Sequence, residues 1–100
     1  MRFDTISARD LYKYMDRLRY TLIDVRSADE YRQGHISGAV NIPYDTMTIP
    51  LSGIDPGKTC VLYCDRGATS LLAARKLFDH GYNVLSVIGG LAAYDGPVER

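Results

Sequence analysis

The sequence has no excess of charge and no long apolar run. Twelve lysines and arginines balance twelve aspartates and glutamates. No global field therefore attracts nucleic acid or an anionic membrane, and any electrostatic function must be local. No apolar run approaches membrane-spanning length, and residues 1–7 include acidic and polar residues where a signal peptide needs an apolar stretch. We expect a cytoplasmic protein with no nucleic-acid or membrane partner.

The chain has only two cysteines, Cys60 and Cys64, and two histidines. The cysteines lie four residues apart in a segment that is extended by its composition, which cannot fold back sharply enough for a disulfide. Two thiols without a suitably placed histidine also fall short of the four ligands of a structural zinc site. We expect two free thiols and no metal site.

The length and composition are those of an ordinary globular protein. The 100 residues are 46% hydrophobic and 24% charged, without repeats or biased tracts. A chain of this length buries between roughly 60 and 70% of its unfolded surface, enough for one core. We predict one domain over residues 1–100, either a monomer or a weak homodimer.

Short apolar segments alternate with helical patterns. Residues 21–25, 39–42, 59–63 and 84–88 are too short and too β-branched for helices and predict strands. Strands that are apolar throughout and alternate with helices are typical of an α/β fold with a central parallel sheet covered on both faces. Ligands of such sheets bind beyond the carboxyl ends of the strands. Cys64 follows one of these ends.

Four helical patterns accompany these strands. Ser27 and Glu30 form a capping box that opens a short helix, which Gly34 can end. A final turn or two of helix is predicted around residues 91–94. The two amphipathic patterns rest on apolar residues at helical spacing: Ala8, Leu11, Met15 and Leu18, then Leu71, Ala74 and Phe78.

The loop after the third strand has the features of an anion cradle. A strand-to-helix loop points backbone N–H groups into one concavity, and the helix N-terminus adds partial positive charge. Gly67 permits the tight curve, and Thr69 or Ser70 can cap the helix with a hydroxyl. We expect the charge of Arg66 to lower the pKa of the Cys64 thiol and that of Asp65 to oppose it, so that the backbone N–H groups matter more than either side chain. We predict a thiolate at Cys64, and an inert core residue at Cys60.

Two segments carry a family resemblance. Residues 22–43, LIDVRSADEYRQGHISGAVNIP, are similar almost position for position to a signature of the rhodanese-like sulfurtransferases. Residues 64–70, CDRGATS, resemble the active-site loop of that family, and Gly89-Gly90 is a weaker third match. The resemblance implies the rhodanese-like three-layer α/β fold, a central parallel sheet flanked by helices.

The resemblance also implies a function for the loop. Cys64 would take a sulfane sulfur from a donor such as thiosulfate, hold it as a persulfide and pass it to cyanide or a thiol, without metal or organic cofactor. The implied sulfur-binding residues are Asp65, Arg66, Gly67, Ala68, Thr69 and Ser70. The opposed charges of Asp65 and Arg66 leave the donor open, and a protein-bound persulfide or a protein acceptor is an alternative.

Other functions remain as alternatives. A binding or sulfur-relay module could share the fold, and a redox switch is a weaker option because Cys60 is poorly placed as a resolving thiol. Cysteine phosphatases and arsenate reductases use a similar cradle, but they need an arginine six residues after the cysteine, where this chain has Ser70.

The charged residues of the first signature invite a catalytic reading, which we do not adopt. We expect Arg26 to pair with Glu30 across the helix start. We expect His35 to hydrogen-bond to neighbouring backbone.

Overall fold

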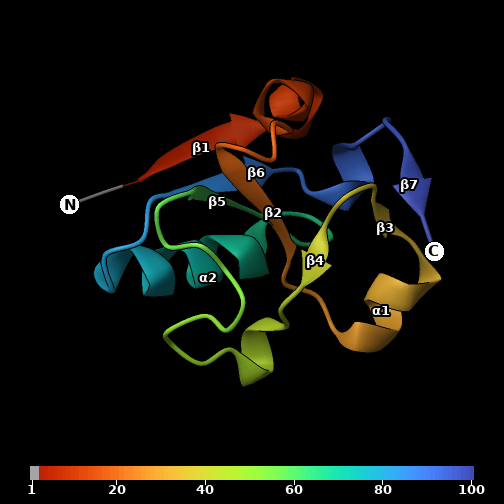
Figure 1. Cartoon of the computed structure of the whole chain (residues 1–100). Coiled ribbons are helices and arrows are strands. Elements are labelled where there is room, and N and C mark those ends of the chain that lie inside the picture. The colour runs from red at the N-terminus through yellow and green to blue at the C-terminus, as the bar shows by residue number, and fades with distance from the viewer. Residues whose placement is uncertain (1–2) are drawn as a thin grey trace.

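The computed structural model describes residues 3–100. Its main sheet has five parallel strands (Figure 1). Their order across the sheet is β1 (Asp4–Ser7), β6 (Val84–Ile88), β5 (Thr59–Tyr63), β2 (Tyr20–Asp24) and β4 (Val40–Asn41). A separate antiparallel pair joins β3 (His35–Ile36) to β7 (Val98–Glu99). The expected parallel sheet is confirmed, whereas β1, β3 and β7 were not predicted.

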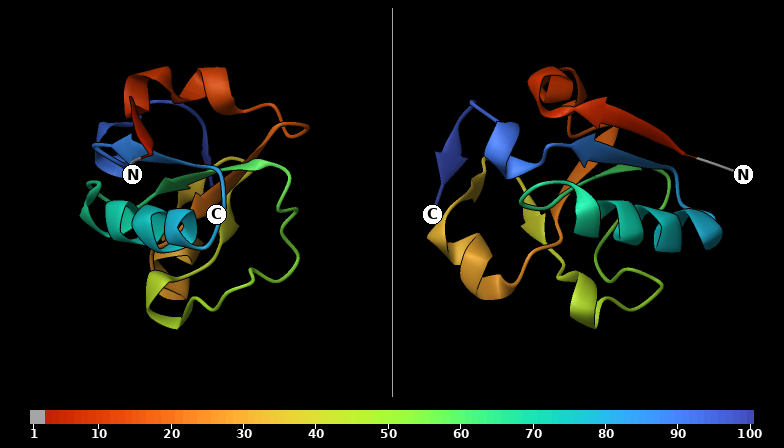
Figure 2. Two further views of the ribbon diagram at one scale, coloured as in Figure 1. Left: turned by 90° about the vertical axis from the view of Figure 1, so that its left-hand side faces the viewer. Right: turned by 180° about the vertical axis from the view of Figure 1, so that it is seen from behind.

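The helices lie on both sides of the sheet. Helix α2 (Ala68–Asp79) covers one face, and the 3₁₀ helix η1 (Ala8–Tyr14) covers the other (Figures 1 and 2). The remaining helices are α1 (Ala28–Gln33), η2 (Tyr44–Thr46) and η3 (Leu91–Ala93). No helix in residues 3–100 is long and apolar enough to cross a membrane.

The central strand β5 supplies both apolar layers. Cys60, Leu62 and Cys64 belong to the core under α2, while Val61 and Tyr63 belong to the core under η1. Successive side chains of a strand point to opposite faces, so a strand covered on both faces must be apolar at every position. This double burial explains why β5 coincides with the predicted strand 59–63.

The first helical pattern is only half right. Ala8 and Leu11 are buried, but η1 ends at Tyr14, and Leu18 is 85% exposed. The reason is a turn at Asp16, whose carboxylate accepts the Leu18 N–H at 2.9 Å and whose carbonyl oxygen accepts the N–H groups of Arg19 and Tyr20. An aspartate that bonds the backbone two residues on favours a turn over continued helix.

The other helix predictions have mixed outcomes. The capping box at Ser27 and Glu30 is present, with both reciprocal hydrogen bonds, and α1 ends before Gly34 as expected. In α2 the buried face consists of Ser70, Ala73, Ala74 and Leu77. The spacing placed Leu71 in the apolar stripe, but its side chain is 47% exposed. The face of α2 that packs on the sheet is centred on Ala73, Ala74 and Leu77, and Leu71 lies to one side of it.

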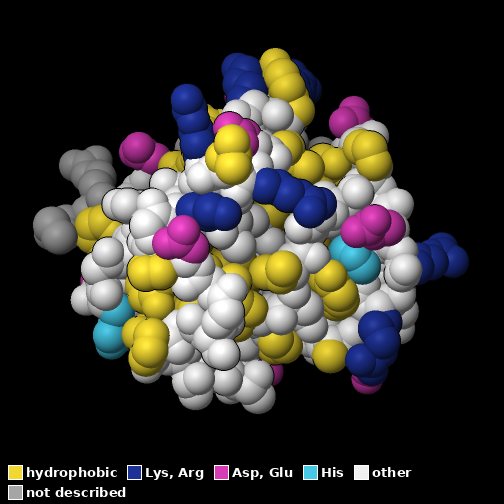
Figure 3. Space-filling view, in the orientation of Figure 1, with side chains coloured by type: hydrophobic (Ala, Val, Ile, Leu, Met, Phe, Trp, Pro, Cys, Tyr) yellow, Lys and Arg dark blue, Asp and Glu magenta, His cyan; other side chains and the backbone are white. Residues whose placement is uncertain are grey.

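Charged side chains of both signs are interspersed on the face shown in Figure 3. Dark blue and magenta groups alternate there, with apolar side chains between them. This face carries no field of a single sign.

Candidate active site

Cys64 lies immediately beyond the carboxyl end of β5, where the chain turns into α2. Its Sγ accepts the backbone N–H of Gly67 at 3.1 Å and that of Ser70 at 3.3 Å. Gly67 has φ +111°, a left-handed conformation that glycine adopts without strain, and this aims its N–H back at the sulfur. The predicted cradle of N–H groups therefore exists around the sulfur.

These N–H groups set the ionisation of the thiol. Burial by itself raises the pKa of Cys64, but hydrogen bonds from Ser70, Gly67 and the backbone of Arg66 outweigh burial and lower the pKa below its usual value. The direction of this shift is the one expected for Cys64, and hydrogen bonds rather than neighbouring charges produce it. By contrast, burial raises the pKa of Cys60 to about 11. Both cysteines are free.

The hydroxyl groups of the helix start do not cap it. The residue before α2 is Gly67, and no side chain caps this end. Ser70 is fully buried, and its Oγ donates to the Gly67 carbonyl oxygen at 3.2 Å and lies 3.2 Å from the Ser86 Oγ. The prediction that Thr69 or Ser70 caps the helix is wrong, because the N–H groups such a cap would take point at the Cys64 sulfur.

The segment that begins at Gly89-Gly90 packs against the backbone of the Cys64 loop. The N–H of Leu91 donates to the Cys64 carbonyl oxygen at 2.8 Å, and that of Ala92 donates to the Asp65 carbonyl oxygen at 2.9 Å. A Cβ on Gly90 would lie 2.7 Å from both the carbonyl carbon and the carbonyl oxygen of Asp65. Only glycine lets the two backbones approach this closely.

Arg26 joins the two signature segments. Its guanidinium donates to both Asp24 carboxylate oxygens, at 2.8 to 3.1 Å, and to the Gly34 carbonyl oxygen at 2.6 Å. Its Nη1 also lies 3.3 Å from the Asp65 carboxylate, next to Cys64 in the sequence. The predicted pair with Glu30 is wrong, because the fully buried Asp24 takes the guanidinium instead.

Glu30 and Asp65 meet at the edge of the loop. Hydrogen bonds from Ser27 lower the pKa of Glu30. Burial and the neighbouring Glu30 raise the pKa of Asp65, although Arg26 acts in the opposite direction. The two shifts have opposite directions because Ser27 stabilises the Glu30 carboxylate, and this charge disfavours ionisation of Asp65.

His35 has the backbone role that was expected. Its Nδ1 lies 2.8 Å from the Tyr31 carbonyl oxygen, and its ring stacks on that of Tyr31 with centroids 3.7 Å apart. Its Nε2 lies 3.5 Å from the Glu99 carboxylate. These contacts hold α1 against β3 and β7.

A hollow of about 730 Å³ opens over Cys64. Of the predicted site residues, Cys64, Asp65, Arg66, Ala68 and Thr69 line it. Gly67 and Ser70 lie behind the sulfur as donors. The opposite wall, Pro43 to Thr46, was missed by sequence reasoning, since that loop has no periodicity to place it.

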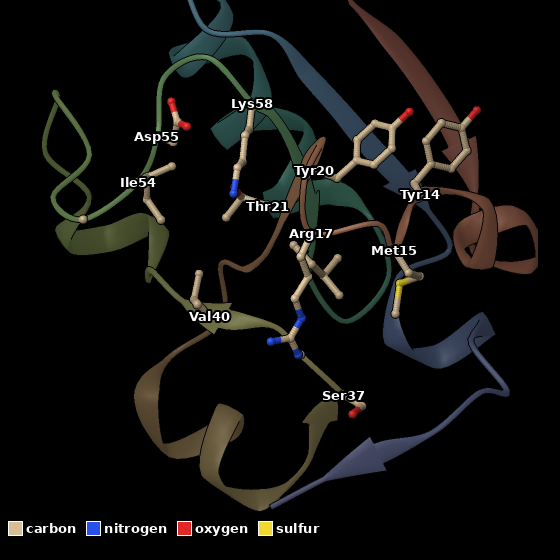
Figure 4. Close-up of a pocket in the computed structure, with 13 residues that line it drawn as sticks. Tyr14, Met15, Arg17, Tyr20, Thr21, Ser37, Val40, Ile54, Asp55 and Lys58 are labelled. Atoms are coloured by element: carbon tan, nitrogen blue, oxygen red, sulfur yellow. The ribbon is translucent and has the colours of Figure 1, made fainter.

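A second hollow, of about 300 Å³, lies beside the first half of β2 (Figure 4). Arg17 and Lys58 reach into it from different segments, over Thr21 and Val40. It contains no cysteine or histidine, and therefore no nucleophile of the kind at Cys64. Within residues 3–100, no three His, Cys, Asp or Glu side chains lie close enough together to hold a metal ion.

A sequence model of the Rhodanese-like domain matches residues 7–96. The chain belongs to the rhodanese-like family. The tRNA sulfurtransferase of Desulfurococcus amylolyticus is 37% identical over 79 residues, which make up 79% of this chain but 16% of that protein. A sulfurtransferase of Allochromatium vinosum is 36% identical over 74 residues, covering 73% of this chain and 69% of that protein.

The solved structures agree on the fold. A crystal structure of a rhodanese-like domain protein from Staphylococcus aureus superimposes with a TM-score of 0.85, at 25% identity and 97% coverage of both chains. The rhodanese-like three-layer arrangement predicted for this chain is therefore confirmed. The kinship with sulfurtransferases supports sulfur transfer as the general chemistry of the family to which this chain belongs.

Proposed function

We propose that this rhodanese-like domain is an enzyme that transfers sulfane sulfur through a persulfide on Cys64. The donor is a small molecule such as thiosulfate, and the acceptor is cyanide or a thiol, with a protein acceptor as the alternative. One observation carries the proposal: the Cys64 sulfur accepts two backbone N–H groups while it lines an open hollow. A buried structural thiol has no need of such donors.

The chemistry is a double displacement. The Cys64 thiolate attacks the outer sulfur of the donor, the bond between the two donor sulfurs breaks, and its electron pair leaves with the departing group, sulfite in the case of thiosulfate. The acceptor then attacks the outer sulfur of the persulfide, and the Cys64 thiolate leaves. The donors of Gly67 and Ser70, together with the start of α2, stabilise the anionic sulfur in both steps.

The same geometry argues against phosphoryl chemistry. A phosphatase cradle needs a cation from the first turn of the helix to hold the oxygens of the transferred phosphoryl group. Here that turn offers Ser70, which is buried against Ser86 and the Gly67 carbonyl oxygen. Hydrolysis of a phosphotyrosine analogue that disappears in Cys64→Ser would contradict this argument.

Intact-mass analysis after incubation with thiosulfate tests the proposal. We expect one added sulfur atom on the native chain and on Cys60→Ser, removed by cyanide, and none on Cys64→Ser. Repeated formation of thiocyanate from thiosulfate and cyanide separates an enzyme from a binding or relay module. A module without catalysis would take up sulfur too slowly to sustain it. Sulfur that follows Cys60, or no uptake from any donor, would refute the mechanism.

A further inference from the structure

Three carboxylates stand at the edge of the hollow over Cys64. Glu30 comes from α1, Asp45 from η2 and Asp65 from the loop itself, and all three line the hollow. We call them the acidic rim. They belong to three separate segments, so the fold brings them together around the sulfur. A donor must pass this rim to reach Cys64.

The rim has little positive charge to offset it. Two arginines, Arg26 and Arg66, line the same hollow. Arg26 is 9% exposed and its guanidinium is held by Asp24, the Gly34 carbonyl oxygen and Asp65, so its charge is already matched. Arg66 forms no ion pair within the described residues and is the cation left for a ligand.

Charge at the rim affects donors differently. Thiosulfate is a dianion, which Arg66 attracts and the rim repels. Glu30 and Asp45 contribute most of this repulsion, because Asp65 is paired with Arg26. A persulfide on a cationic carrier is attracted by the same carboxylates. Because charges at the mouth of a cleft act on encounter, the effect falls on loading of the sulfur and weakens with salt.

We propose that the acidic rim selects the sulfur donor by charge, disfavouring dianionic thiosulfate and favouring a persulfide whose carrier is positively charged. This inference rests on the proposed persulfide at Cys64. The loading step is Cys64–S⁻ + R–S–SH → Cys64–S–SH + R–S⁻. The bond from Sγ to the outer sulfur forms, the donor S–S bond breaks, and its electron pair leaves on the carrier thiolate, so no outside oxidant or reductant takes part.

Asp45 provides the cleanest variant. It is exposed, and it has no ion-pair partner within residues 3–100, so Asp45→Asn removes rim charge without breaking an ion pair. Asp79→Asn at the last residue of α2 is the matched control, since it removes the same charge far from the loop. Thermal melting of both variants verifies the fold.

The experiment measures the second-order rate of sulfur loading on Cys64 by quenched-flow mass spectrometry. The donors are thiosulfate and the persulfides of cysteamine and 3-mercaptopropionate, a cation and an anion. Each rate is divided by the rate of the same donor with 2-mercaptoethanol, which removes differences in intrinsic reactivity. We expect Asp45→Asn to raise thiosulfate loading on the order of fivefold at low salt, and Asp79→Asn to leave it unchanged.

The dependence of the loading rates on salt is an independent test of the charge selection. Added salt should speed loading by thiosulfate and slow loading by cysteamine persulfide. Equal normalised rates for all donors, or equal effects of Asp45→Asn and Asp79→Asn, would overturn the charge selection while leaving the persulfide mechanism intact. Failure of every donor to load Cys64 would overturn the proposed function and this inference with it.

Discussion

Replacing Arg26 by methionine tests whether the buried ion pair supports the fold or serves the substrate. Asp24 is fully buried, and Arg26 holds both of its carboxylate oxygens. Methionine keeps most of the apolar volume of the side chain but leaves the Asp24 carboxylate without its counter-ion. Removing one partner of a buried pair is strongly destabilising, because the remaining charge stays out of water.

The structure places the expected loss at the lower end of the usual range. Breaking such a pair costs about 3–5 kcal/mol. In this case the Arg26 backbone N–H still donates to the Asp24 carboxylate at 2.9 Å. We expect the free energy of unfolding to fall by about 3 kcal/mol, a large part of the roughly 5–15 kcal/mol typical of a domain.

Urea denaturation followed by circular dichroism measures this loss. Arg32→Met is the matched control, because Arg32 pairs with Asp29 on the surface, where both side chains are more than half exposed, and an exposed pair contributes about 0–1 kcal/mol. The double variant Asp24→Leu with Arg26→Met should recover part of the loss. If Arg26→Met loses less than about 1 kcal/mol yet fails to load sulfur, the structural role is refuted and Arg26 acts on the substrate.

Two further predictions follow. Gly90→Ala should lower the free energy of unfolding by about 2–3 kcal/mol, because the added Cβ overlaps the Asp65 carbonyl group. The same variant should slow alkylation of Cys64 by iodoacetamide at neutral pH. Gly53→Ala is the control: Gly53 also has a positive φ (+75°) but lies in open space, so this variant should keep the native alkylation rate. The raised pKa of Cys60, about 11, means that its contribution to stability is complete below about pH 9 and is lost as the pH rises toward 11. Between pH 8 and pH 11, the free energy of unfolding measured in urea should therefore fall by about 2 kcal/mol more for the native chain than for Cys60→Ala. Equal losses in the two proteins would contradict the burial argument.

Local signals account for the parts of the fold that the sequence predicts. The strands of the doubly covered sheet are short apolar runs, and the capping box at Ser27 and Glu30 is complete within four residues. The missed strands lack such signals. In β1 only Ile6 is buried, and β3 and β7 are two residues each, paired across more than 60 residues of sequence. Their existence depends on tertiary contacts that no sequence window contains.

The candidate site also has one part that local sequence predicts and one part that depends on tertiary contacts. The cradle around Cys64 follows from a strand end, a glycine and a helix start, all in consecutive residues. The pairing of Arg26 with Asp65 joins positions 39 residues apart, and the sequence favoured the nearer Glu30. The wall at η2 also depends on tertiary packing. Long-range contacts thus decide the charge around the sulfur, while local structure decides its hydrogen bonds.

The two cysteines show why position at the strand end matters more than burial. Cys60 lies within β5 and Cys64 directly after it. Both belong to the same core layer, and they are 0% and 5% exposed. Burial raises the pKa of both thiols. At Cys60 the surrounding N–H groups are committed to the sheet ladder, so nothing opposes that effect. Cys64 lies one residue beyond the ladder, where the first N–H groups of α2 have no carbonyl partner in their own helix and turn to the sulfur instead. A cysteine moved back by one residue would point into the other core layer, and one moved forward would leave the cradle. The position just after β5 therefore lowers the pKa of this thiol.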